Sequence, residues 1–116
     1  MRILVCGGAG YIGSNMTAML ENHGHQPIVL DNLTKGHRPA TRNARFIYGD
    51  LGAYDSTVNI LKDYKIDAVM HFAAFIEVGK SVEQPLKYYQ NNLCNTRNLL
   101  AAMQTAGVDK FVFSST

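Results

Sequence analysis

Three glycines near the start of the chain have the spacing of a turn that binds nucleotide phosphates. Gly7, Gly10 and Gly13 form a G-x-x-G-x-x-G pattern directly after a short apolar run and at the start of a helical pattern. The first glycine permits a tight turn, the second lets backbone approach a pyrophosphate, and the third allows close packing of helix on sheet. The helix N-terminus adds free N–H groups that favour an anion. Glycines also mark ordinary turns, but the strand before and the helix after this triplet favour a dinucleotide site.

Asp31 stands at the end of the second predicted strand, 18 residues after Gly13. A carboxylate in this position can accept hydrogen bonds from both hydroxyls of an adenine ribose. Its charge would repel a 2′-phosphate, so the sequence favours NAD over NADP, although Lys35 and Arg38 nearby soften that preference. The alternative is that Asp31 caps the turn that begins at Asn32.

Two more polar residues lie at or near the ends of predicted strands. Asp50 follows Gly49 and is either a turn residue or an acceptor for the adenine amino group. His71 precedes the apolar stretch 72–74, where a core histidine is favoured over a catalytic base. The small side chains of Ala73 and Ala74 would let a cofactor lie close to the backbone.

Three hydroxyl-bearing residues close the fifth predicted strand. Ser114, Ser115 and Thr116 follow the apolar stretch 111–113. Such residues can cap a strand end through local hydrogen bonds. At a carboxyl edge that binds a cofactor, one of them could instead hydrogen-bond a substrate hydroxyl during hydride transfer.

The elements that must position these residues alternate between strand and helix. Apolar runs predict strands at 2–6, 27–31, 45–50, 67–74 and 110–114, with a polar loop at 32–44. Helical spacing of apolar residues predicts three helices. The first runs from the glycine turn to Gly24 with a face of Ile12, Met16, Met19 and Leu20, and the second starts near Asp55 or Ser56 with a face of Val58, Leu61 and Tyr64. The third runs from about Pro85 to Gly107, and its face consists of Leu86, Tyr89, Leu93, Thr96, Leu100 and Met103. This alternation predicts an α/β fold, a doubly wound parallel sheet in the order 3-2-1-4-5.

Composition narrows the class of protein. The chain has 116 residues, 47% of them hydrophobic, which fits one domain. Eleven basic and nine acidic residues leave a net charge of +2, so nucleic acid is not an expected partner. Cys6 and Cys94 lie in apolar stretches and are expected to be buried free thiols in a reducing cytoplasm, with no metal-ligand spacing. No stretch approaches about 18 apolar residues, so no membrane span is expected.

Several motifs together resemble the extended short-chain dehydrogenase/reductase family, and within it the nucleotide-sugar epimerases. They are "GGAGYIG", "LDNL", "GDL", "HFAA", "VGKSVEQPLKYYQNN" and "FVFSST", and they run the length of the chain. The resemblance implies a Rossmann-like fold, tightly held NAD, a UDP-sugar substrate, removal of a hydride from C4 of the hexose, and its return to the other face. A dehydratase, decarboxylase or dehydrogenase of the same family, or a non-catalytic dinucleotide-binding module, is the alternative.

The resemblance also implies roles for individual residues. The pyrophosphate would contact Gly7, Gly10, Tyr11, Ile12 and Gly13, and the adenosine ribose would be surrounded by Asp31, Asn32, Leu33, Thr34, Lys35 and Gly36. The adenine would lie at Asp50 and Leu51, and the nicotinamide half would lie along Phe72, Ala73, Ala74, Phe75 and Ile76. Two further residues would contact the cofactor, Asn91 and Ser114. Thr116 would be the catalytic hydroxyl that hydrogen-bonds the C4 hydroxyl of the sugar.

Two departures from the family pattern shape the expectation for these 116 residues. Ile76 stands where relatives often carry a lysine near the nicotinamide ribose, and no Tyr-x-x-x-Lys follows Thr116. We therefore expect residues 1–116 to be an incomplete NAD-binding domain, truncated after its fifth strand and without a substrate domain, that binds NAD but does not turn substrate over. An unpaired sheet edge, and a long helix that contributes to dimers in intact relatives, predict a homo-oligomer.

Overall fold

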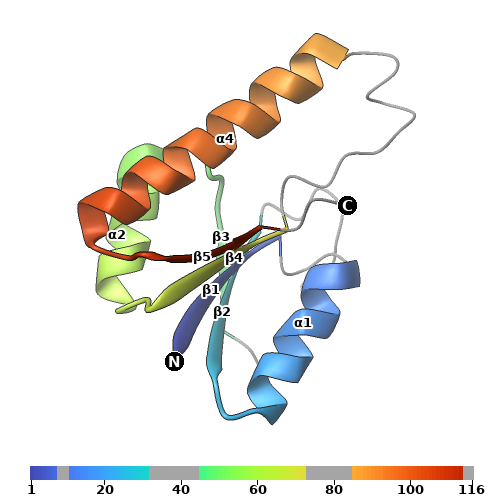
Figure 1. Cartoon of the computed structure of the whole chain (residues 1–116), viewed down its shortest axis with the longest axis vertical. Helices are drawn as coiled ribbons and strands as arrows, with labels where there is room; N and C mark the ends of the chain where they lie inside the picture. Colours follow the sequence, from blue (N-terminus) through green and yellow to red (C-terminus); the bar gives the residue numbers. More distant parts are fainter. Residues whose placement is uncertain (8–10, 32–44, 73–84, 114–116) are drawn as a thin grey trace.

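The chain folds into a five-stranded parallel sheet with helices on both faces. The structure is a computed structural model that describes residues 1–7, 11–31, 45–72 and 85–113 (Figure 1). Its elements, in chain order, are β1 (Arg2–Cys6), α1 (Tyr11–Asn22), β2 (Gln26–Asp31), β3 (Arg45–Tyr48), α2 (Tyr54–Asp63), β4 (Ala68–His71), α4 (Pro85–Ala106) and β5 (Lys110–Phe113). Within the described ranges, no helix is long and apolar enough to cross a membrane.

The strand order is β3-β2-β1-β4-β5, with every neighbouring pair parallel. This confirms the predicted order and the Rossmann-like fold class. Cys6 pairs with Leu30 of β2 on one side and with His71 of β4 on the other. The order reverses at β1, since β2 and β3 follow on one side and β4 and β5 on the other. Ligands of open α/β sheets bind outside the carboxyl ends of the strands at such a reversal.

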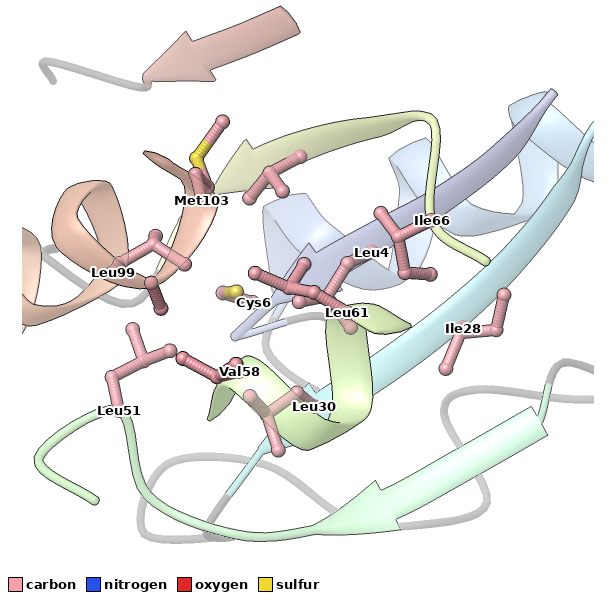
Figure 2. Packing of buried hydrophobic residues seen from close by; sticks show 12 residues of the cluster. Leu4, Cys6, Ile28, Leu30, Leu51, Val58, Leu61, Ile66, Leu99 and Met103 are labelled. Atoms are coloured by element: carbon pink, nitrogen blue, oxygen red, sulfur yellow. The ribbon is translucent and has the colours of Figure 1, made fainter. Parts of the chain in front are cut away.

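Alternate residues of β1 supply the two cores on either side of the sheet. Ile3 and Val5 pack with Leu20 on the face covered by α1. Leu4 and Cys6 face the larger core beneath α2 and α4, where most of the buried apolar side chains gather (Figures 1 and 2). A strand covered on both faces carries apolar residues throughout, which explains why "RILVC" has almost no polar residue.

Two strands are shorter than the sequence predicts. β3 ends at Tyr48, not at residue 50, because the chain turns there: the N–H of Gly52 donates to the Oδ1 of Asp50 at 3.0 Å. A side chain that bonds the backbone two residues on replaces the strand ladder with a turn. β4 spans Ala68–His71, within the predicted 67–74, and residues 73–74 lie outside the described ranges.

The helix after β3 begins one residue before the predicted start. α2 starts at Tyr54 with Ala53 in the N-cap position and no side-chain hydrogen bond there. Asp55, predicted as a possible start, lies instead in the first turn, where a negative charge interacts favourably with the helix dipole. The predicted apolar face is confirmed for Val58 and Leu61, which are buried.

Helix α1 buries less of its apolar pattern than predicted. Leu20 is buried and Met16 packs against it. Ile12 and Met19, from the same predicted face, are exposed. One helix crossing a parallel sheet buries only the stripe that touches the strands, so apolar residues beside that stripe stay in solvent.

Helix α4 buries only part of its predicted face: Met103 is in the core as predicted, and Thr96 is partly buried. Leu99, Ala102 and Met103 enter the core, whereas Leu86, Leu93 and Leu100 are exposed by 82%, 68% and 45%. Cys94 is exposed too, so its predicted burial is wrong, while Cys6 is fully buried as predicted. Apolar residues occur all round α4, and only its packing on the sheet selects the buried stripe.

Candidate cofactor site

The carboxyl ends of β2, β1 and β4 bring three predicted site residues to one edge of the sheet. They are Asp31, Gly7 and Phe72, each at or just beyond the end of its strand. Backbone hydrogen bonds extend the alignment past the strand ends: Gly7 N donates to Leu30 O at 2.8 Å, and Phe72 N donates to Cys6 O at 2.8 Å. The three ends are therefore held in line at the point where the strand order reverses.

Gly7 has the backbone conformation that its proposed role requires. Its φ of +79° lies in the left-handed region, which a residue with a Cβ adopts only at a steric cost. The turn leads to α1, whose third residue, Gly13, is buried. The Thr17 hydroxyl donates to Gly13 O at 2.7 Å and is itself buried. These features match the turn and the close-packing glycines predicted from sequence.

Asp31 lies half-buried beside the end of β1. Its main-chain oxygen accepts a hydrogen bond from Gly49 N at 3.1 Å, which ties it to the end of β3. Complete burial raises the pKa of the Cys6 thiol, and the negative charge of Asp31 raises that pKa further. Cys6 therefore stays a neutral, unreactive thiol. The effect also shows that the carboxylate of Asp31, at the end of β2, is close enough to the end of β1 to influence the charge of a group there.

Asp50 and Leu51 have different surroundings, although the resemblance assigns both to the adenine. Asp50 is exposed and its carboxylate accepts from Gly52, so the turn role considered for it is observed. Leu51 is only 5% exposed and belongs to the core beneath α2 and α4. Because the Leu51 side chain is buried there, its backbone is the part available to a ligand. The side-chain amide of Asn98 on α4 donates to Gly52 O at 3.3 Å and holds this turn.

His71 is the core histidine that the sequence favoured. It is 1% exposed, and its Nε2 lies 3.2 Å from the hydroxyl of Thr96 on α4. The Phe113 ring meets the imidazole edge-on, with centroids 5.5 Å apart. Burial lowers the pKa of His71 to about 4, so the ring is neutral at pH 7. Sequence reasoning missed Thr96 as its partner; a threonine within an apolar helical pattern was the available signal.

We expect this histidine to make the fold sensitive to acid. A pKa of about 4 in the folded chain, against 6.5 for an unperturbed histidine, means that the unfolded chain binds the proton more tightly. The contribution of His71 to stability is complete above pH 6.5 and is lost as the pH falls towards 4, by an amount on the order of 3 kcal/mol.

Chemical denaturation at steps between pH 7 and pH 4 measures this loss. His71→Gln, which keeps a polar side chain near Thr96 but does not titrate, is the matched control for the carboxylates that protonate in the same range. The free energy of unfolding of this variant should fall less steeply with acid. Parallel profiles for the two proteins would contradict the assignment.

The remaining predicted site residues lie outside the described part of the structure. They are Gly10, Asn32, Leu33, Thr34, Lys35, Gly36, Ala73, Ala74, Phe75, Ile76, Ser114 and Thr116, together with the side chains of Tyr11 and Asn91. Their roles stay predictions. In the ranges that are described, no cluster of three or more histidine, cysteine or acidic side chains could hold a metal ion.

Known proteins resemble this chain along its whole length. The model of the NAD dependent epimerase/dehydratase family matches residues 3–116. The UDP-glucose 4-epimerase of Halalkalibacterium halodurans is 49% identical over 116 residues, which cover 100% of this chain and 35% of that protein. The chain thus spans about a third of the length of this relative.

Two solved structures share the fold as well as the sequence pattern. The UDP-glucose 4-epimerase of Brucella ovis in complex with NAD matches with a TM-score of 0.94 and 43% identity, over 98% of this chain and 35% of that one. The Thermotoga maritima UDP-glucose 4-epimerase with UDP-glucose matches with a TM-score of 0.92 and 37% identity, over 100% and 38%. The family model covers nearly every residue, and the fold and the glycine turn at the reversal of strand order agree with it. The chain therefore belongs to the NAD-dependent epimerase/dehydratase family.

Proposed function

We propose that residues 1–116 form the NAD-binding part of a UDP-glucose 4-epimerase, which interconverts UDP-glucose and UDP-galactose. The observation that carries the proposal is the pairing of a left-handed Gly7 turn with the carboxylate of Asp31 at the reversal of strand order. The similarity to a UDP-glucose 4-epimerase at 49% identity supports the choice of enzyme. In this proposal residues 1–116 are one domain, and the sugar-binding domain belongs to the part of the relatives' length that the chain does not span.

The residues of the chain have separate tasks in this proposal. The Gly7 turn and the start of α1 hold the pyrophosphate. Asp31 accepts hydrogen bonds from the hydroxyls of the adenosine ribose, and Asp50 accepts one from the adenine amino group. Bound NAD supplies an acceptor for the hydride taken from C4 of the hexose. Thr116 orients the C4 hydroxyl by a hydrogen bond. The roles given above to residues 32–36, 73–76 and 114, and to Asn91, belong to the same proposal.

A pair of glycine variants tests the proposed site. Gly7 and Gly107 both have a φ of +79°, so an alanine at either position costs about 1–2 kcal/mol in backbone strain. Only Gly7 lies in the proposed phosphate turn. We expect Gly7→Ala to weaken NAD binding by about tenfold, because the turn that presents N–H groups to the pyrophosphate is reset.

Calorimetric titration with NAD, beside thermal unfolding, separates strain from binding. Gly107→Ala should lower the unfolding temperature similarly and leave NAD affinity unchanged, since a Cβ there meets nothing within 4 Å. Equal losses of affinity in both variants, or none in Gly7→Ala, would refute the phosphate-binding role of this turn.

The exposed face of α4 supports a homo-oligomer as part of the proposal. Leu86, Leu93 and Leu100 recur every seven residues and are all exposed in the single chain. Val112 and Phe113 on the edge strand β5 are exposed too. A second copy that lays its own α4 along this leucine stripe would cover it, as helices with a seven-residue apolar repeat do.

Leu93→Lys is expected to weaken self-association by about tenfold or more, because a charge would be buried in the contact between two α4 helices. Sedimentation at several concentrations measures the change. Lys62→Leu, which removes a charge from α2, is a control that should leave the association constant unaltered. A wild-type chain that stays at 12.8 kDa at every concentration would contradict the oligomer.

The proposed location of the protein is the cytoplasm, where a reducing environment keeps the Cys94 thiol reduced.

A further inference from the structure

The carboxyl end of β4 is connected to α4 by a partly buried side-chain hydrogen bond. His71 is the last residue of β4, and its Nε2 lies 3.2 Å from Thr96 Oγ1 near the middle of α4. Phe111 and Phe113 of β5 pack on the same imidazole, at centroid distances of 6.2 and 5.5 Å. The ring is therefore enclosed by one helix and one strand, with a hydroxyl as a polar neighbour.

The backbone at this point is also fixed to the centre of the sheet. His71 is in register with Cys6 of β1 and with Phe113 of β5. The next residue, Phe72, donates its N–H to Cys6 O at 2.8 Å, so the end of β4 cannot move without disturbing β1. The hydrogen bond between His71 and Thr96 adds the third attachment, to the helical layer. The strand end is held by a sheet neighbour on each side and by α4 above it.

The carboxyl end of β4 lies where the nicotinamide half of the proposed NAD would bind, an inference that rests on the proposed function. A dinucleotide lies across the reversal of strand order, with one mononucleotide over each half of the sheet. Asp31 ends β2 in the half made by β1, β2 and β3, which is the half for adenosine. The other mononucleotide, with its nicotinamide, must then lie over the ends of β4 and β5.

We propose that Thr96 and His71 are a positioning pair that sets the carboxyl end of β4 for the nicotinamide half of the cofactor. Neither side chain reacts: His71 is buried on the α4 side, and it acts through the backbone that follows it. When Thr96 loses its hydroxyl, the imidazole loses the hydrogen bond that connects it to α4, and the ring shifts. The strand end relaxes with it, while the adenosine half at β1 and β2 keeps its geometry.

Comparison of two ligands on one set of variants tests the pair. NAD carries both halves of the dinucleotide, whereas ADP carries only the adenosine half and a pyrophosphate. We expect Thr96→Val, which keeps the branched shape, to bind NAD about fivefold more weakly and to bind ADP within about twofold of the wild type. Thr96→Ser, which restores the hydroxyl, should recover NAD affinity.

A second hydroxyl on the same helix provides the matched control. Thr105 lies nine residues further along α4 and bonds Tyr54 of α2 at 2.6 Å. Thr105→Val removes a comparable side-chain hydrogen bond away from the end of β4 and should leave both affinities unchanged. If Thr96→Val does not fold, Thr96→Ala takes its place, with circular dichroism melts recorded for every variant.

Each outcome decides the matter. A selective loss of NAD affinity that serine rescues supports the positioning pair. Equal losses of affinity for NAD and ADP in Thr96→Val would show a general structural effect, and an unchanged NAD affinity would show that the hydroxyl does not matter for binding. Either result would overturn the positioning role of Thr96 and His71 while leaving the proposed function intact. A wild-type chain that binds neither nucleotide would refute the proposed function and this inference with it.

Discussion

Replacement of Asp31 by alanine is expected to weaken NAD binding by about 10- to 100-fold. Asp31 ends β2 beside the Gly7 turn, where a carboxylate can accept both hydroxyls of the adenosine ribose. A hydrogen bond to a charged group contributes about 1.5–3 kcal/mol, which corresponds to this range of affinity. The loss should fall on NAD more than on NADP, because the same carboxylate repels a 2′-phosphate. The ratio of the two affinities should therefore move towards NADP.

Titration calorimetry with NAD and with NADP on the same preparations measures both effects. Asp109→Ala is the matched control, since the Asp109 side chain is 88% exposed and pairs only with its neighbour Lys110, at 3.6 Å, in the described structure. This variant removes one negative charge without touching the ends of β1 and β2. If the two variants lose NAD affinity equally, the effect is one of net charge, and Asp31 does not bind the ribose.

Replacement of Leu99 by alanine should produce the largest loss of stability among single core substitutions in α4. Leu99 is 0% exposed and packs in the core between α4, α2 and the sheet, near Met103, Leu51 and Val58 (Figure 2). Truncation removes buried apolar area and leaves a cavity, at a cost of about 2–5 kcal/mol for leucine. A domain of this size is stable by about 5–15 kcal/mol, so the variant keeps only a part of that margin.

Chemical denaturation at neutral pH gives the free energy of unfolding for wild type and variant. Met19→Ala on α1 is the control, because Met19 is 53% exposed and its truncation should cost no more than about 0.5 kcal/mol. A loss below about 1 kcal/mol for Leu99→Ala would mean that α4 does not pack on the sheet through this residue.

Local signals in the sequence were sufficient to predict the strand order and the edge of the sheet at which the proposed site lies. The apolar run of β1, the glycine turn after it and the helical spacing that follows are all short-range features. A right-handed crossover then determines on which side of β1 each new strand is added. The positions of Gly7 and Asp31 at the reversal of strand order follow from those rules, and the structure confirms both.

The faces of the helices could not be predicted in the same way. α4 carries leucines at 86, 93 and 100 as well as at 99, so the sequence contains more than one apolar stripe at helical spacing. The stripe that enters the core depends on the sheet and on α2, which are distant in sequence. The predicted face contains the buried Met103 but also the exposed Leu86, Leu93 and Leu100. Cys94 was expected to be buried because it lies in an apolar stretch, and it is exposed.

What the sequence by itself determined was therefore the fold class, the order of the strands and the edge at which the proposed cofactor residues Gly7 and Asp31 lie. What only the tertiary structure decided was the set of contacts between distant elements: Thr96 with His71, Asn98 with the turn after Asp50, and Leu99 with the core. The reason is physical. Periodicity and turn residues act over a few neighbouring positions, whereas the partner of a buried side chain is selected by the packing of the whole domain.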